Sequence, residues 1–334
     1  MKILHVVPGL NNPFNGIAVA AKLIAGEQAA EMVDAQEFGK IKDLAKYEEV
    51  WVHSCWLPMT LKACWRVVKA KRPLVRMTHA NLDPVRLRYH NWKKWLVGPI
   101  ERWALRRCEK IVATCDAEKE WIEAYEPGVK KIEIVDIERF FKLSRVERVD
   151  RVEGDESVFN TEAQRRRGTE KDELHLLYLG RRHPLKGVEY LERAVREISI
   201  GSTRSTRLNI ELRIVSDAKG EELETIWEWC DVLVLPTLSE NFGLVVAEAL
   251  ERGKRVITTD GAPAWGEGLE LRVESGGVEE LRVESGGVKS VGVGSEIWSG
   301  NEGRLIYLKG YRDGTDEERV ELLKRGISFL AAKV

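Results

Sequence analysis

The sequence predicts an α/β fold with two domains of the βαβ type. Short apolar runs alternate with helical patterns along most of the 334 residues, as is typical of parallel sheets whose strands are joined by helices. A chain of this length can form two domains of about 150 residues each. We therefore expect two parallel sheets, in two domains that face each other across a cleft.

The apolar runs between the helical patterns have the length and composition of buried strands. In the first half of the chain they cover residues 3–7, 50–53, 74–77, 111–113 and 132–135. In the second half they cover residues 174–179, 208–215, 232–235, 255–258 and 304–308. Each run is short enough to be one strand of a parallel sheet.

The end of the chain predicts a helix over residues 315–332. Thr315 and the acidic residues after it are typical of a helix start. Val320, Leu323, Ile327 and Leu330 recur at helical spacing and form one apolar face. We expect residues 315–334 to be a terminal helix that packs on another part of the fold.

Two stretches lack the pattern of packed structure. Residues 144–173 are crowded with charges of both signs and predict a linker between an N-terminal domain of residues 1–143 and a C-terminal domain of residues 174–314. The segment LRVESGGV occurs identically at 271–278 and 281–288. Because a solenoid needs three or more repeats, a duplicated surface loop or a small hairpin is the better interpretation.

Composition excludes several functions. The chain has 53 Lys and Arg against 54 Asp and Glu, so it lacks the charge of a general nucleic-acid binder. Its five cysteines show no metal-ligand spacing, which favours reduced thiols and a cytoplasmic protein. The first apolar run is too short for a signal-peptide core, and no run approaches the roughly 20 apolar residues of a membrane span.

Glu240 and Glu248 lie eight residues apart in SENFGLVVAEALERG, residues 239–253. Pro236 ends a strand pattern, and Asn241 and Gly243 mark the start of a helix, so the first glutamate lies at a helix N-terminus. That end of a helix suits a diphosphate. The two carboxylates could bind hydroxyl groups on either side of it, as in a nucleotide-sugar. Alternatively, both are solvated surface residues.

Arg181 and Lys186 favour the ligand site over the surface interpretation. They lie in RRHPLKG (181–187), directly after the strand pattern LHLLYLG (174–180) and before a helical stretch. Ligands of open α/β sheets bind at this end of the strands. Two fixed cations can neutralise a diphosphate, and Arg adds planar contact with phosphate oxygens.

These motifs resemble glycosyltransferase family 4, the retaining enzymes of the GT-B fold with two Rossmann-like domains. In the second half the resemblance rests on Gly-Arg-x4-Lys-Gly (180–187), Glu-x7-Glu after SENFG, and GKRVITTDGAP (253–263). In the first half it rests on NGIAVAAKLIA (15–25), WVHSCWLP (51–58), THANLDPVRLRYHNWKKWL (78–96) and IVATCDAEKEWI (111–122). The last two segments look like those of bacterial polysaccharide and lipopolysaccharide members.

The resemblance implies a site and a reaction. Glu240 would contact hydroxyl groups of the donor sugar, Glu248 the ribose, and His79 the transferred sugar. The other implied donor-binding residues are Gly16, Arg181, Lys186, Asn241, Phe242, Gly243 and Leu244. The weaker acceptor-side residues are His53, Asn81 and Asp83. The terminal helix would cross back onto the N-terminal domain.

The implied reaction is retaining transfer of a hexose-type sugar from a nucleotide-diphosphate donor to a glycan or lipid-linked acceptor. The chain has no Asp-x-Asp pair to hold a divalent cation, so we expect Arg181, Lys186 and the helix start to stabilise the diphosphate without metal or cofactor. The pathway would be cell-surface polysaccharide or lipopolysaccharide biosynthesis. The segment 211–236 is shorter than in the family, which leaves the nucleotide base open.

Residues 86–110 carry eight Lys and Arg against two Glu, interleaved with Trp92, Trp95 and Trp103. Basic residues with aromatic neighbours can bind an anionic membrane surface. A core-facing tryptophan stripe with a solvated basic face explains the pattern equally well.

Three other functions are considered. A nucleotide-sugar epimerase of the same architecture would also bind a sugar diphosphate. An oxidoreductase is excluded because no Gly-x-Gly-x-x-Gly follows the first strand. A degenerate, non-catalytic partner subunit would have lost the charged donor residues, and Arg181, Lys186, Glu240 and Glu248 are all present.

Overall fold

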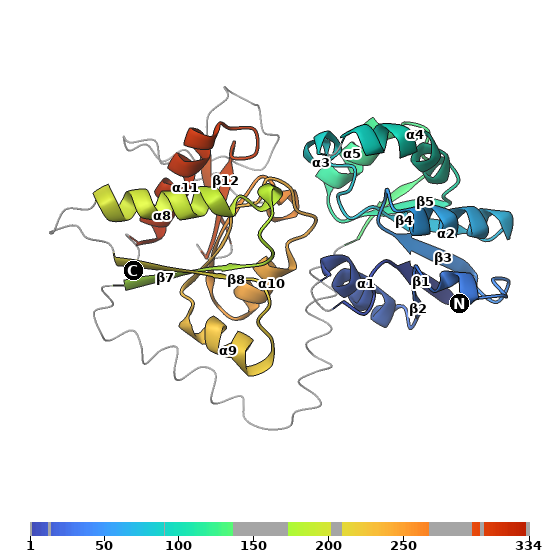
Figure 1. Cartoon of the computed structure of the whole chain (residues 1–334), viewed down its shortest axis with the longest axis horizontal. Helices are drawn as coiled ribbons and strands as arrows, with labels where there is room; N and C mark the ends of the chain where they lie inside the picture. Colours follow the sequence, from blue (N-terminus) through green and yellow to red (C-terminus); the bar gives the residue numbers. More distant parts are fainter. Residues whose placement is uncertain are drawn as a thin grey trace, which may run out of the picture. The chain divides into compact units, whose positions relative to one another are not determined.

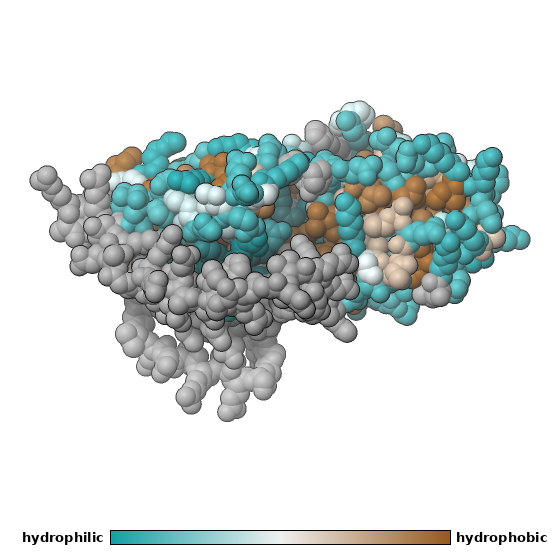
Figure 2. All heavy atoms as spheres, turned by 90° about the horizontal axis from the view of Figure 1, so that it is seen from below, coloured by the Kyte–Doolittle hydropathy of each residue, from teal (hydrophilic) through white to brown (hydrophobic). Residues whose placement is uncertain are grey.

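The computed structural model divides the chain into two compact units, Met1–Arg166 and Arg167–Val334, which Figure 1 draws in blue to green and in yellow-green to red. It describes residues 2–12, 15–89, 91–135, 173–201, 209–266, 296–300 and 304–331. The predicted linker, apart from residue 173, and the repeated LRVESGGV segments lie outside the described residues. On the face drawn in Figure 2, the described surface is mostly hydrophilic, and apolar side chains gather mainly on the first unit.

The first unit contains a six-stranded sheet in the order β2-β1-β3-β4-β5-β6, and all its described strand pairs are parallel. The strands are β1 (Ile3–Val7), β2 (Glu31–Asp34), β3 (Glu49–His53), β4 (Leu74–Met77), β5 (Lys110–Ala113) and β6 (Ile132–Ile134). Five of them match predicted strands. The edge strand β2 was missed because its residues are only partly buried and lack an apolar run.

Helices cover both faces of this sheet. They are α1 (Gly16–Glu27), α2 (Pro58–Lys69), α3 (Pro84–Arg88), α4 (Asn91–Arg106) and α5 (Asp116–Tyr125), and a 3₁₀ turn spans Phe38–Lys40. Successive residues of a strand point to opposite faces. Leu4 and Val6 of β1 therefore pack in the cluster that contains α2 and α4, whereas Val7 packs with Ala18 and Ala21 of α1.

The second unit contains a six-stranded sheet in the order β11-β12-β10-β9-β7-β8. The strands are β7 (Glu173–Leu179), β8 (Asn209–Val215), β9 (Val232–Leu235), β10 (Arg255–Thr259), β11 (Glu296–Gly300) and β12 (Leu305–Lys309). Strand β11 is antiparallel to β12, so the expectation of a purely parallel sheet is wrong at this edge. The sequence pattern of residues 264–302 carried no strand prediction.

The helices of the second unit are α8 (Val188–Gly201), α9 (Gly220–Trp229), α10 (Leu244–Glu251) and α11 (Asp316–Ala331). Two 3₁₀ turns span Pro184–Lys186 and Pro263–Trp265. No helix among the described residues is long and apolar enough to cross a membrane.

Helix α11 begins where the sequence predicts. Thr315 and Glu318 form a capping box, in which the Glu318 N–H donates to Thr315 Oγ1 at 3.3 Å and the Thr315 N–H to Glu318 Oε2 at 2.7 Å. The helix packs against α8 and β12, and Gly326 lies close to Leu308. The buried face of this helix is used within the second unit, and the expectation that the helix also braces the N-terminal domain stays a prediction.

Candidate functional site

Loops from three neighbouring strands form the candidate donor site of the second unit. They follow β7, β9 and β10, which lie side by side in the sheet order and are parallel. Their carboxyl ends therefore meet at one edge, where ligands of such sheets bind. All the predicted donor residues of this unit lie on these loops or on α10.

Lys186 and Glu240 form an ion pair that joins two of these loops. Lys186 Nζ contacts Glu240 Oε2, and the two side chains are 21% and 19% exposed. Glu240 Oε1 also accepts from the Asn241 N–H at 3.0 Å, and the Glu240 N–H donates to the Gly261 carbonyl at 2.7 Å. The sequence predicted these two side chains for one site, and the structure places them in contact.

Close backbone contacts fix the loops to one another. Gly187 has a φ of +61°, and a Cβ there would overlap the carbonyl oxygen of Pro236. A Cβ on Gly261 would overlap the Thr237 carbonyl in the same way. The Leu238 N–H donates to the Leu185 carbonyl at 2.9 Å. The three loops therefore form one block, with Lys186 and Glu240 held at its surface.

Helix α10 begins at Leu244, as the sequence predicts, and Gly243 precedes it with a φ of +70°. Phe242 is buried, its ring lies 5.1 Å from that of Trp265, and its carbonyl accepts from Trp265 Nε1. Phe242 thus anchors the loop rather than lining open space. Leu244 and Glu248 are half-buried on the helix.

Arg181 is exposed at the end of β7. Its carbonyl accepts from the Tyr178 hydroxyl at 2.9 Å, which fixes the backbone but leaves the guanidinium outside this contact. The next residue, Arg182, pairs with Glu192 at 2.6 Å on the surface. Arg181 and Arg182 are therefore adjacent arginines in different surroundings.

Gly16 is the first residue of α1 in the first unit, after the capping residue Asn15. A Cβ built on Gly16 would meet no atom within 4 Å, and its backbone is not left-handed. Neither packing nor backbone conformation within the described residues requires glycine here. The open space at the helix start is what a ligand approaching the backbone would use.

His79 lies in an unusual turn after β4. It is 1% exposed, and both His79 and Ala80 have left-handed backbones, with φ of +53° and +55°. Such conformations cost non-glycine residues about 1–2 kcal/mol each and often mark functional turns. Burial and Arg86 lower the pKa of His79 to about 3, so its ring is neutral near pH 7. Its Nε2 lies 2.9 Å from Nδ1 of His53.

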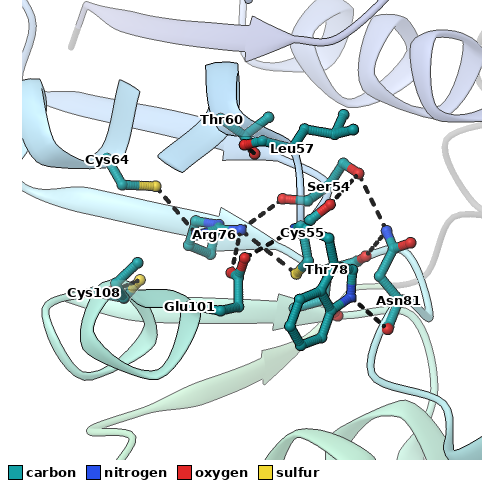
Figure 3. A network of polar contacts seen from close by, with 12 residues as sticks. Ser54, Cys55, Leu57, Thr60, Cys64, Arg76, Thr78, Asn81, Glu101 and Cys108 are labelled. Atoms are coloured by element: carbon teal, nitrogen blue, oxygen red, sulfur yellow. Dashed lines mark hydrogen bonds and ion pairs between the residues drawn. The ribbon is translucent and has the colours of Figure 1, made fainter. Parts of the chain in front are cut away.

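The acceptor-side residues are held within their own unit. His53 is fully buried. Asp83 is fully buried too and caps α3 by accepting from the Val85 N–H at 2.8 Å. Asn81 donates to the Thr78 carbonyl at 2.6 Å, a contact drawn in Figure 3. These contacts give all three residues a role in the loop structure.

Sequence reasoning missed Glu118, which holds the turn at His79. This carboxylate of α5 is 1% exposed and accepts from the Ala80 N–H at 2.6 Å, the Thr78 hydroxyl at 2.6 Å, and the N–H and hydroxyl of Thr114 at 2.8 Å. The segment that contains Glu118, IVATCDAEKEWI, was identified by its family resemblance. Nothing in its sequence shows that the Glu118 carboxylate would accept these four hydrogen bonds.

A second missed feature is the fully buried ion pair between Arg76 of β4 and Glu101 of α4, shown in Figure 3, with 2.7 Å between the charged atoms. Arg76 also donates to the Ser54 carbonyl at 2.6 Å, and Glu101 accepts from the Trp56 N–H at 2.9 Å. An arginine inside the apolar strand LVRM is the signal that could have revealed it.

The two alternatives for residues 86–110 can now be compared. Trp92 and Trp95 of α4 are 64% and 76% exposed, so the core-facing interpretation is wrong for both. Trp103 is half-buried. A groove of about 520 Å³ lies between α2 and α4 and is lined by Leu61, Lys62, Trp65, Pro99, Ile100 and Trp103.

One group with metal-ligand atoms occurs among the described residues. Glu173, His175 and Glu211 lie together near the amino ends of β7 and β8, away from the loops of the donor site. Glu211 accepts from Arg213 Nε at 2.9 Å, and Glu173 accepts from Asn209 at 3.0 Å. Protein groups therefore already bind both carboxylates.

Solved structures share the fold of the chain. A sucrose-phosphate synthase of Thermosynechococcus elongatus has a TM-score of 0.52 at 14% identity, over 77% of this chain and 80% of that one. An Escherichia coli trehalose-6-phosphate structure, bound with UDP-2-fluoro glucose, has a TM-score of 0.53 at 9% identity, over 80% of this chain and 86% of that one. At such identities the likeness shows the fold alone, the GT-B fold with two Rossmann-like domains.

Sequence comparison then gives the family. The model "Glycosyltransferase Family 4" matches residues 34–136, and "Glycosyl transferases group 1" matches residues 173–283. The chain belongs to the family 4 glycosyltransferases.

Two curated relatives match part of the chain. A D-inositol 3-phosphate glycosyltransferase of Pseudarthrobacter chlorophenolicus is 31% identical over 30% of this chain and 30% of the relative. An uncharacterized glycosyltransferase of Methanocaldococcus jannaschii is 29% identical over 28% of each chain. The matches thus span less than a third of the length of these curated relatives.

Proposed function

We propose that the chain is a retaining, metal-independent glycosyltransferase of the cytoplasm. It moves a hexose-type sugar from a nucleotide-diphosphate donor to a glycan or lipid-linked acceptor in cell-surface polysaccharide or lipopolysaccharide biosynthesis. The observation that carries the proposal is the ion pair of Lys186 and Glu240 on two fixed loops at the carboxyl edge of the sheet.

The ion pair places a cation and a carboxylate side by side, which suits a ligand that has both phosphate and hydroxyl groups. On donor binding, Lys186 turns to a diphosphate oxygen and Glu240 accepts from a sugar hydroxyl. Each side chain thereby exchanges one charge-assisted contact for another, so neither charge is left unpaired. Arg181 adds the second cation, and the start of α10 contributes the partial positive charge of a helix N-terminus.

Glu248 completes the donor contacts of the second unit. The half-buried carboxylate of Glu248 binds the ribose, one helix turn or more beyond the diphosphate. In the first unit, the family resemblance makes Gly16 a donor-binding residue, and the open space beside it leaves the start of α1 accessible to a ligand. The cations at Arg181 and Lys186 take the place that a divalent ion fills in other transferases, and the departing phosphate acts as the base on the same face of the sugar.

Two other functions compete with transfer. A non-catalytic partner subunit would not need the ion pair or the open helix start. An epimerase would bind the same donor but release a changed nucleotide-sugar without an acceptor. The intact set of charged residues favours transfer over the first, and the family favours it over the second.

The exposed face of α4 fits a lipid-linked acceptor. Trp92 and Trp95 stand beside Lys93, whose Nζ lies 5.4 Å from the centre of the Trp92 ring. Exposed aromatic rings with cations bind the interface of an anionic membrane. Sedimentation with phosphatidylglycerol vesicles tests this interpretation. The parent protein should bind these anionic vesicles but not neutral ones, and the double variant Trp92→Ala, Trp95→Ala should bind neither. Binding that survives both substitutions would contradict it.

Thermal unfolding with UDP-, GDP- and ADP-linked sugars tests the donor site. A donor at about 100 times its dissociation constant adds about 2.7 kcal/mol to the stability of the unit that binds it. We expect one nucleotide class to raise the melting temperature, and Arg181→Ala or Lys186→Met to remove the rise. Arg182→Ala is the matched control, because that neighbour pairs with Glu192 on the surface.

Turnover separates transfer from the competing functions. Glu240→Gln should keep nucleotide binding yet strongly reduce sugar transfer, because it loses the charge that binds the sugar hydroxyl. Unchanged turnover in this variant would overturn the assignment of Glu240. Failure of every nucleotide-sugar to stabilise the parent protein would favour the partner subunit, and interconversion of donor sugars without an acceptor would favour the epimerase.

A further inference from the structure

Glu173, His175 and Glu211 place an imidazole and two carboxylates side by side on the sheet of the second unit. Glu173 and His175 are two residues apart in β7, so their side chains lie on the same face of that strand. In the parallel register His175 lies directly beside Glu211 of β8. One ligand atom from each residue lies within 4.8 Å of the other two. The register of two neighbouring strands therefore builds the group.

The connection between α9 and β9 holds His175 in one orientation. Its Nδ1 lies 3.1 Å from the carbonyl oxygen of Trp229 and 3.4 Å from Oδ2 of Asp231. Its ring stacks on that of Trp229, with 4.6 Å between the ring centres. Because both neighbours of Nδ1 accept, Nδ1 carries the proton, and in the neutral ring the lone pair lies on Nε2. A histidine that binds a metal ion almost always donates its other N–H to a carbonyl or carboxylate in this way.

The distance between His175 and Glu173 fits two ligands of one cation. Nε2 of His175 lies 3.7 Å from Oε2 of Glu173. This is too long for a hydrogen bond, and a protonated ring would approach the carboxylate to about 2.8 Å. Two ligand atoms that each lie about 2.1 Å from a tetrahedral zinc ion are about 3.4 Å apart. The observed separation is therefore closer to that of two metal ligands than to that of a hydrogen-bonded pair.

Neighbouring side chains orient both carboxylates through one oxygen each. Asn209 donates to Oε1 of Glu173 at 3.0 Å, and Arg213 Nε donates to Oε1 of Glu211 at 2.9 Å. Carboxylates that bind metal ions are themselves hydrogen-bonded in this manner, and Oε2 of each lies outside these two bonds. The side chains of Glu173 and Glu211 are 43% and 41% exposed. Both can therefore rotate toward a shared ion that enters from solvent.

We propose that Glu173, His175 and Glu211 bind one divalent transition-metal ion, Zn²⁺ or a close neighbour, which ties the edge strand β8 to β7. An imidazole nitrogen with carboxylate oxygens suits zinc, whereas Mg²⁺ and Ca²⁺ prefer oxygen ligands. Three protein ligands leave a fourth position for water. The site lies near the amino ends of the strands, away from the donor loops. The inference is therefore independent of the proposed sugar transfer and gives the ion no part in it.

Titration calorimetry of chelator-treated protein with zinc chloride at pH 7.5 tests the site. We expect one Zn²⁺ to bind per chain and Mg²⁺ not to bind under the same conditions. Glu173→Gln and Glu211→Gln each remove a charge but keep an oxygen for the neighbouring donor, and each should weaken zinc binding at least tenfold. His175→Gln should weaken it at least as much. Glu222→Gln and His183→Gln change exposed residues of the same unit and are the matched controls.

Two further measurements locate the ion. Zinc should slow hydrogen exchange in peptides from β7 and β8, and Glu211→Gln should remove that protection. Long-range ¹H–¹⁵N NMR of histidine-labelled protein should show His175 with Nδ1–H before zinc is added and a shifted Nε2 resonance afterwards. Equal affinity for Mg²⁺, zinc binding that the three substitutions leave unchanged, or no zinc binding at all overturns the proposal. A His175 ring that stays protonated on both nitrogens in the presence of zinc overturns it as well.

Discussion

Mild acid should destabilise the first unit because of its buried histidines. His5, His53 and His79 have ordinary pKa values near 6.5 in the unfolded chain, and burial lowers all three in the folded chain, to about 4 for His5 and about 3 for His79. The unfolded state therefore binds more protons below pH 6.5. The stability that comes from the neutral rings is complete above that pH and is lost as the pH falls toward 4.

The size of the loss follows from proton linkage. Between pH 7.5 and 5.5 each ring that titrates only in the unfolded state costs about 1.4 kcal/mol, so three rings cost about 4 kcal/mol. This is a large part of the roughly 5–15 kcal/mol that stabilises a typical domain. Carboxylates with a lowered pKa, such as Glu31 at about 2, add their own loss only at lower pH.

Urea unfolding at pH 7.5, 6.5 and 5.5 measures the effect, with pulse hydrogen-exchange mass spectrometry to follow β1 and β3 peptides separately from the second unit. His53→Gln removes one ring, so the acid loss should fall to about two thirds of the parent value. His183→Gln changes an exposed ring and is the control. A loss below about 1 kcal/mol in the parent protein would refute the neutral state of the three buried rings.

Three further changes test other contacts. Glu101→Leu should destabilise the first unit by about 3–5 kcal/mol in urea, since it leaves Arg76 charged and buried, and adding Arg76→Met should recover most of the loss. Gly187→Ala should lower the stability of the second unit and abolish donor-dependent stabilisation, because the Cβ meets Pro236; normal binding in that variant would contradict the fixed loops. Glu118→Gln should cost about 2 kcal/mol in urea through weaker bonds to the turn, and an unchanged unfolding midpoint would show that the carboxylate charge is not needed.

The sequence predicted most of the fold because parallel strands that are buried on both faces leave a plain signal. Runs such as VLVL at 232–235 are apolar at every position, and β9 has those bounds. Strand β2 at an exposed edge and the antiparallel β11 lack that signal. The contacts of α11 with α8 and β12 were not predicted, because an apolar face shows that a helix packs but not what it packs on.

The candidate site was predicted only as far as local motifs reach. Lys186 and Glu240 lie 54 residues apart and were assigned to one donor site, but their ion pair was not predicted. Glu118, Arg76 and Glu101 were not recognised, because their roles depend on partners elsewhere in the fold and on hydrogen bonds that no spacing encodes. The sequence therefore does not predict the roles of single polar residues that are buried and bonded to distant parts of the chain.

The close packing of the loops after β7, β9 and β10 limits which sequence changes this site can accept. At Gly187 and Gly261 there is no room for even one additional carbon, since carbonyl oxygens of the neighbouring loop occupy that space. Evolution or an engineer can therefore exchange the exposed side chain of Arg181 or those on α10, but cannot lengthen or reshape one loop without disturbing the others. A change of donor preference would have to come from side-chain substitutions that leave the backbone of these loops unchanged.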